Sequence, residues 1–172
     1  MNTITYLIST FMLVQIDKDL ITALVERWRP ETHTFHMPVG EMTITLQDVE
    51  AILGLSTEGR VVSGRTHANW GAVMHQYMGL TPSEEYLNGG NIKMRWFAAN
   101  WGRWDEHSDT IQGQLLYTCA YLMRLFGGFL LCDKSSHEVA CRYIQLLGGD
   151  LSDTAGYSRG SAVLATLFRE IC

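Results

Sequence analysis

The sequence has little positive charge and no motif that identifies a cofactor. Its 172 residues contain 13 Lys and Arg against 18 Asp and Glu, which gives a formal net charge of -5. This balance works against nonspecific attraction to phosphate backbones, so strong autonomous binding to nucleic acid is disfavoured. Neither a Gly-x-x-x-x-Gly-Lys phosphate loop nor a Gly-x-Gly-x-x-Gly dinucleotide fingerprint occurs. We therefore expect no cofactor.

Cysteine is also scarce, and no Cys-x-x-Cys pair occurs. The four cysteines stand at irregular spacings, which is ordinary for a reducing compartment: Cys119, Cys132, Cys141 and Cys172. We expect free thiols. The apolar run from Tyr6 to Ile16 has no Lys or Arg before it, so the positive region of a secretory signal is missing.

The longest apolar stretch, Leu115 to Cys132, has the length of a membrane span but contains residues that disfavour insertion into a bilayer. Arg124 lies inside it, and a central Arg costs roughly 2.5–3.5 kcal/mol on insertion scales. Gly127 and Gly128 suit a helix end better than a bilayer centre. The stretch predicts a buried core helix, and we expect no membrane partner.

The N-terminal third predicts a helix followed by a hairpin. Apolar residues from Leu20 to Trp28 recur at helical spacing, and Pro30 is expected to end this helix because proline disfavours helical geometry in the preceding residue. Alternation over residues 32–45, around Val39-Gly40, predicts a short β-hairpin. Thr45 and Asp48 then have the spacing of a capping box, which opens a helix that carries Val49, Ile52 and Leu53 inward and closes at Gly54.

The rest of the chain predicts further helices and one long loop. A helix is expected over 70–78, ended by Gly79, and the polar segment Thr81 to Asn91 is expected to be an exposed loop. Met94, Phe97, Trp101 and Trp104 have the spacing of one helical face. The fold class is therefore mainly α (α+β), a multi-helix domain with one short N-terminal hairpin around residues 32–45.

Three more helices are expected towards the C-terminus. Asp109, with Gln112, should cap a helix that ends at Gly127, with an inward face at Ile111, Leu115, Cys119, Leu122 and Phe126. Ser135 and Glu138 have capping-box spacing before a helix that should point Val139, Tyr143, Leu146 and Leu147 inward. A last helix begins near Ser158, with an apolar face at Leu164, Leu167, Phe168 and Ile171.

Residues Gly156 to Gly160 match Gly-x-Ser-x-Gly, the nucleophile elbow of α/β-hydrolases. That elbow needs a preceding strand and a later acid and histidine, yet neither Asp nor His follows Ser158. We therefore interpret Ser158 as an N-cap, and we expect no catalytic residue.

The spacing of the candidate His and Cys ligands also disfavours a metal site. His33 and His36 would point to opposite faces of a strand. His137 and Cys141 would share a helical face near Cys132, but Asp133 is the only near candidate for a fourth zinc ligand, and the spacing matches no zinc pattern. We expect buried thiols, a surface histidine and no metal.

Two other groups of polar residues were weighed as sites. Asp105, Glu106 and Asp109 are acidic but lie together in a polar connector, where a solvated role is ordinary. The lysines Lys18, Lys93 and Lys134 could form a Schiff base with pyridoxal phosphate, but no site for its phosphate is evident.

The one stretch that suggests nucleic acid interleaves cations with aromatic residues. It contains Arg95, Trp96, Phe97, Trp101, Arg103 and Trp104, a mixture found on surfaces that stack single-stranded bases. An inward role for Phe97, Trp101 and Trp104, with the arginines in solvent, is favoured by their helical spacing. A nucleic-acid-binding module that uses Arg95, Trp96 and Arg103 remains the alternative.

One family resemblance rests on two segments. The first runs from Glu26-Arg27-Trp28-Arg29-Pro30 through His36 to Val49, and the second from Gly156-Tyr157-Ser158-Arg159-Gly160 to Ala165. Together with Gly54-Leu55 they resemble the plant mobile domain, found in plant transposons and in host proteins descended from them. Members usually carry Trp at the position of Arg159. The resemblance covers 17–172 and predicts an atypical segment at 1–16 and a domain truncated on its C-terminal side.

The resemblance implies a role but no reaction. Some members are labelled aminotransferase-like or are fused to a serine/threonine phosphatase, but a cofactor lysine site and phosphatase metal motifs are both missing from this sequence. Host members imply a nuclear protein needed for meristem maintenance, genome stability and transposon silencing. The expected function is a noncatalytic protein-interaction domain whose partners are other nuclear proteins, such as a phosphatase-like protein or a second plant mobile domain protein.

Overall fold

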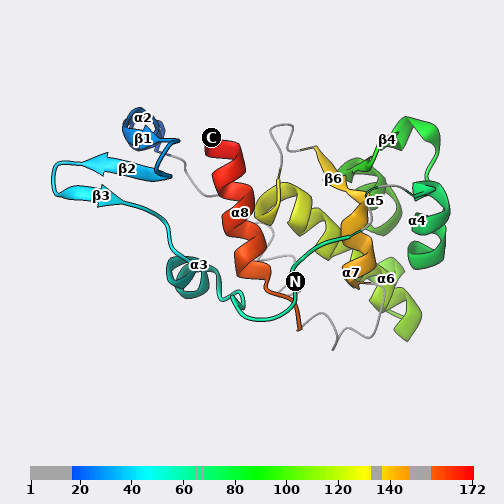
Figure 1. Cartoon of the computed structure of the whole chain (residues 1–172). Coiled ribbons are helices and arrows are strands. Elements are labelled where there is room, and N and C mark those ends of the chain that lie inside the picture. The colour runs from blue at the N-terminus through cyan, green and yellow to red at the C-terminus, as the bar shows by residue number, and fades with distance from the viewer. Residues whose placement is uncertain (1–16, 65, 67, 133–136, 148–155) are drawn as a thin grey trace. The chain divides into compact units, whose positions relative to one another are not determined.

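The computed structural model describes residues 17–64, 66, 68–132, 137–147 and 156–172, which belong to two compact units (Figure 1). The first, called the N-terminal unit here, extends to Thr43 and includes Ile171–Cys172. The second, called the main unit, comprises Ile44–Glu170. Most of the described core lies in the main unit.

The N-terminal unit begins with helix α2, Lys18–Arg27. The Asp17 carboxylate caps it by accepting the N–H groups of Asp19 and Leu20 at 3.1 and 3.0 Å. The amphipathic helix is therefore confirmed, but none of its residues is buried, and Leu20 and Val25 are 55% and 63% exposed.

A three-stranded antiparallel sheet follows, in the order β1-β2-β3. The predicted hairpin is confirmed as β2, Thr34–Met37, and β3, Gly40–Met42. Strand β1, Trp28–Arg29, was not predicted: Trp28 pairs with Phe35, so the helix ends before Trp28, which the sequence placed on its apolar face. The reason is tertiary, since the Trp28 and Phe35 rings meet edge to face at 4.8 Å.

The first two helices of the main unit follow their sequence signals closely. In α3, Leu46–Leu53, Thr45 and Asp48 form the predicted capping box and Gly54 ends the helix at φ 63°. Val49 is buried, but Ile52, expected inward, is 78% exposed. Helix α4, Trp70–Met78, has the predicted bounds, with Gly79 at φ 73° beyond its end.

A second sheet replaces the predicted loop. Residues 81–91 contain the turn η1, Glu84–Tyr86, and strand β4, Leu87–Asn88, which pairs with β5, Asn91–Lys93. Strand β6, Glu138–Ala140, lies on the other side of β5, where Ile92 pairs with Val139. The helix predicted from Ser135 is therefore wrong at Glu138–Ala140, because this long-range pairing buries Ile92 and Val139 to 0% and 2% exposure.

Helices α5, Met94–Trp101, and α6, Ile111–Leu125, pack extensively against each other. Phe97 and Trp101 point inward as predicted, whereas Trp104 starts a separate turn, η2, Trp104–Glu106. The cap of α6 is Thr110, not Asp109, because the Thr110 hydroxyl accepts the N–H of Gly113 at 3.0 Å.

The buried face of α6 also differs from the prediction. Tyr117, Ala120 and Met123 are buried, whereas Ile111 and Leu115 are 78% and 40% exposed. The chain does not stop at Gly127 but continues as a π-helical turn, η3, Phe126–Leu130. Glycine is needed at Gly127 because a Cβ atom there would lie 2.6 Å from Cβ of Val139.

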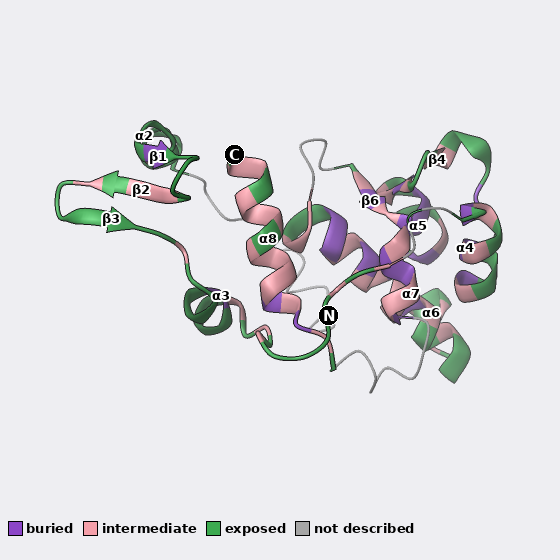
Figure 2. Cartoon of the chain, viewed as in Figure 1, coloured by how far each residue is buried: buried purple, intermediate pink, exposed green. Residues whose placement is uncertain are grey.

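The last elements are the turn η4, Cys141–Tyr143, helix α7, Ile144–Leu147, and helix α8, Arg159–Ile171. The core gathers buried side chains from α4, β5, α5, α6, η3, β6, η4 and α7 (Figure 2). Residues Leu115 to Cys132 therefore contribute to a protein core, as predicted. Among the described residues, no helix combines the length and apolarity that a membrane crossing requires.

Candidate functional site

The segment Ser56–Arg60 holds the start of α8 through main-chain hydrogen bonds. The N–H of Arg60 donates to the carbonyl of Gly156, and the N–H of Ser158 donates to the carbonyl of Arg60, both at 2.8 Å. The N–H of Gly160 donates to the carbonyl of Ser56, also at 2.8 Å. Because these bonds span about a hundred residues of sequence, they fix where α8 begins.

Two glycines of this contact lie too close to their neighbours for any side chain. At Gly59, φ is +114° and a Cβ atom would lie 2.5 Å from the carbonyl oxygen of Gly156. At Gly160, it would lie 2.9 Å from Cγ2 of Thr57. Gly160 of the Gly-x-Ser-x-Gly match and Gly59 opposite it thus permit close backbone approach, which is a structural requirement.

Ser158 serves the same contact. Its side chain is buried, and its hydroxyl donates to the carbonyl of Thr57 at 2.7 Å and lies 2.6 Å from the hydroxyl of Ser161. Ser158 directly precedes α8, as predicted, and its carbonyl accepts the N–H of Ala162 at 3.4 Å. Its hydroxyl bonds the neighbouring segment, whereas a nucleophile elbow exposes its hydroxyl to substrate.

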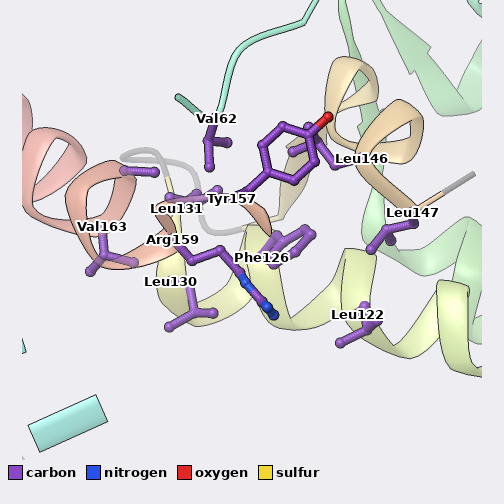
Figure 3. A pocket seen from close by; sticks show the side chains of 11 residues that line it. Val62, Leu122, Phe126, Leu130, Leu131, Leu146, Leu147, Tyr157, Arg159 and Val163 are labelled. Carbon is purple, nitrogen blue, oxygen red and sulfur yellow. The ribbon is translucent and has the colours of Figure 1, made fainter. Parts of the chain in front are cut away.

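This contact places Tyr157 and Arg159 on the wall of an apolar cleft, called the α8 cleft here (Figure 3). Eleven of the described residues line it, from α6, η3 and the residue after η3, α7, α8 and the segments before α4 and α8. Its volume is about 40 Å³. The lining residues are Val62, Leu122, Phe126, Leu130, Leu131, Leu146, Leu147, Tyr157, Arg159, Ala162 and Val163.

Arg159 is the one charged side chain among the described residues that line the α8 cleft. Its Nε atom is buried and has no hydrogen-bond partner in the part of the chain that the structure describes. The guanidinium extends along apolar side chains between Leu130 and Phe126 (Figure 3). A buried donor without an acceptor costs about 1–3 kcal/mol, so the side chain of Arg159 is held here at a cost in stability.

Tyr157, which also lines the cleft, is held in place by a cation–π contact with Arg60. The guanidinium carbon of Arg60 lies 4.4 Å from the ring centre of Tyr157. This contact covers Tyr157 and holds its ring in place beside Val62 and Leu146 (Figure 3). The ring of Tyr157 on the cleft wall is therefore held by a contact within the chain.

The residues proposed to bind nucleic acid have different environments, because Trp96 is buried and the two arginines are exposed. Trp96 is 3% exposed and packs edge to face on Phe97 and Trp101, so its ring is part of the core. Arg95 is exposed but lies 3.9 Å from the carboxylate of Glu85 and stacks over Tyr86 at 5.1 Å. Arg103 pairs with Glu106 at 3.4 Å. The arginines face solvent, as the inward interpretation of the aromatic residues requires.

The residues weighed as metal ligands do not converge. Among the described residues, no group of three His, Cys, Asp or Glu side chains could hold a metal ion. His33 lies in the turn before β2 at φ 53°, not on the strand, and His36 is exposed. His137 precedes a strand, so it shares no helical face with Cys141; Asp133 and Lys134 lie outside the described residues.

The thiols of the main unit are free, and two of them are held in the protonated form by their surroundings. Burial raises the pKa of the Cys141 thiol to about 12, with a smaller contribution from the carboxylate of Glu138. Burial also raises the pKa of Cys119. Because the thiolate is the reactive form, neither environment favours a nucleophile.

Comparison with known proteins supports the family resemblance that the sequence suggests. The model of the plant mobile domain matches residues 4–172. The chain belongs to the plant mobile domain family. Its segments Glu26 to Val49 and Gly156 to Ala165, which carried the resemblance, thus form the sheet with α3 and the start of α8.

Three relatives come from Arabidopsis thaliana, and each alignment covers 92% of this chain. The protein named "Serine/threonine-protein phosphatase 7 long form homolog" is 44% identical over 159 residues, which are 12% of its length. Protein MAIN-LIKE 2 is 36% identical over 23% of its length, and Protein MAINTENANCE OF MERISTEMS is 34% identical over 33%. The chain therefore spans a third or less of these relatives. No solved structure matches.

Proposed function

We propose that this chain is a noncatalytic protein-interaction domain that acts in the nucleus together with other nuclear proteins. Its role would be in meristem maintenance, genome stability and transposon silencing. Membership of the plant mobile domain family and 34% identity to Protein MAINTENANCE OF MERISTEMS support this role. A phosphatase-like protein or a second plant mobile domain protein would be a suitable partner.

The α8 cleft is the observation that carries the interaction proposal. It is apolar, and the one cation among its described lining residues is Arg159, a combination that suits recognition of another molecule. Ser158, in contrast, uses its hydroxyl to attach α8 to Thr57, which favours a scaffold over a reaction centre.

Affinity purification from plant nuclei, followed by mass spectrometry, tests this function. The bait should be the tagged chain, and a matched bait should lack residues 156–172. We expect the same partner in replicate purifications with the intact bait and its loss with the shortened one. Failure to recover any reproducible partner with the intact bait would count decisively against an interaction domain.

A nucleic-acid-binding module is the alternative, and a salt titration separates the two functions. Binding through phosphates weakens steeply as salt rises. The net charge of -5 and the burial of Trp96 disfavour it. We expect no gel shift at physiological salt; a shift that Arg95→Ala with Arg103→Ala abolishes would establish the alternative instead.

A further inference from the structure

Arg159 gives the α8 cleft a chemical preference that its apolar walls alone lack. We propose that the cleft binds a partner segment in which one leucine-sized aliphatic side chain stands beside an Asp or Glu. The aliphatic group would enter between Phe126, Leu130 and Val163, and the carboxylate would accept from the guanidinium of Arg159. This inference deepens the proposed function and depends on it.

The size of the cleft selects a single side chain. A volume of about 40 Å³ is far below the roughly 300–1,000 Å³ of sites that enclose small molecules. A cleft of this size suits the end of one side chain better than a whole small molecule, because the rest of a peptide can stay outside. Hydrophobic anchors of this kind supply much of the binding energy at protein interfaces.

The charge of the cleft selects a carboxylate. Among the described residues that line the cleft there is no Asp or Glu, so none of them places a negative charge beside the guanidinium of Arg159. A carboxylate carries a single negative charge and pairs with a guanidinium through two parallel hydrogen bonds. A phosphate group carries more charge and is ordinarily met by a cluster of cations, whereas the described lining of this cleft contains a single cation, Arg159.

Selection of random displayed peptides on the purified 172-residue chain tests this preference directly. We expect enriched peptides to share an aliphatic residue next to Asp or Glu. Fluorescence anisotropy of one labelled peptide then gives its affinity for each variant. Arg159→Gln should weaken binding about tenfold, the loss expected for a charged hydrogen bond. The peptide with Asn or Gln in place of its acid should bind both proteins equally weakly.

Two further variants make the result specific. Arg169→Gln removes the same charge from an exposed position on α8, where Arg169 pairs with Glu170, and should leave peptide affinity unchanged. Ala162→Leu fills the cleft and should abolish binding while the thermal unfolding transition is retained. Enriched peptides without an acid, no enrichment at all, or equal affinity for Arg159→Gln would each overturn the inference. A partner recovered from nuclei despite such a result would leave the proposed function intact.

Discussion

Two short amphipathic helices, one in each unit, show how differently the same kind of pattern is used. Helix α5 in the main unit buries Trp96, Phe97 and Trp101. Helix α2 in the N-terminal unit is two residues longer, yet none of its residues is buried. Helical spacing therefore shows which side of a helix can be buried, but the neighbouring elements decide whether it is. Trp28 is the one buried hydrophobic residue among the described part of the N-terminal unit.

The largest expected loss of stability comes from removing one aromatic ring, and the two units should differ in this loss. Phe97 is 0% exposed and packs on Trp96 and Trp101, so Phe97→Ala should lower the free energy of unfolding by about 3–5 kcal/mol. Phe35 is half-buried against Trp28, so Phe35→Ala should cost clearly less. Urea unfolding followed by circular dichroism measures both, and equal costs would contradict the contrast between the units.

A smaller effect is expected from one added methyl group at matched glycines. Gly59 in the main unit and Gly40 in the N-terminal unit have similar backbone angles, φ +114° and +128°. Alanine is strained at both, by about 1–3 kcal/mol. Only Gly59 also meets a neighbour, the carbonyl oxygen of Gly156, whereas Gly40 has no atom within 4 Å of an added Cβ.

Gly59→Ala should therefore cost more than Gly40→Ala, and only Gly59→Ala should disturb the start of α8. Thermal unfolding gives the cost, and amide exchange at Arg60 and Ser158, whose N–H groups bond across this contact, locates it. Unchanged exchange at these two amides in Gly59→Ala would show that the Ser56–Arg60 segment does not hold α8.

The fold was predictable where the controlling residues are close in sequence. The capping box at Thr45 and Asp48 and the bounds of α4 follow from contacts within four residues, and both were correct. Strand β6 was missed because its partner, β5, lies 47 residues earlier, and the spacing of Ser135 and Glu138 imitates a helix start. The sequence predicts a helix end at Gly127, whereas in the structure the small size of this residue permits the approach of Val139.

The candidate site was less predictable than the fold. Arg159 stood out in the sequence only as a departure from the family pattern, without a ligand or a partner. Leu122 and Leu147 were expected inward, but their position beside Tyr157 depends on the long-range bonds between Ser56–Arg60 and Gly156–Gly160. No local spacing contains that information, so the α8 cleft could not be found from the sequence.

Helix caps give a third test, of about 1 kcal/mol each. Thr45→Ala removes the hydroxyl that accepts the N–H of Asp48 in α3, and Asp17→Ala removes the carboxylate that caps α2. Because α2 has no buried residue to hold it, Asp17→Ala should unfold α2 locally, seen as faster amide exchange at Asp19 and Leu20. Thr45→Ala should instead lower the unfolding temperature of the main unit. Local opening of α3 in Thr45→Ala, together with a lower unfolding temperature of the main unit in Asp17→Ala, would contradict the difference between the two units.

The smallest expected effect is a pH dependence at the cap of α3. The hydroxyl of Thr45 and then its backbone N–H hold the pKa of the exposed Asp48 carboxyl below its ordinary value of 3.8. Since the folded pKa is the lower one, the stabilisation is present above pH 3.8 and is lost as the pH falls through the folded pKa.

An NMR titration of the Asp48 carboxyl carbon should therefore show its midpoint below 3.8, and Thr45→Ala should move it back towards that value. Asp48→Asn should remove this part of the acid dependence, because the amide does not titrate. A midpoint unchanged by Thr45→Ala would mean that the hydroxyl does not stabilise the carboxylate. Helix α3 would then be stabilised by the burial of Val49 rather than by its cap. In that case α3 would resemble the other packed helices of the main unit, and it would differ from α2, which has no buried residue.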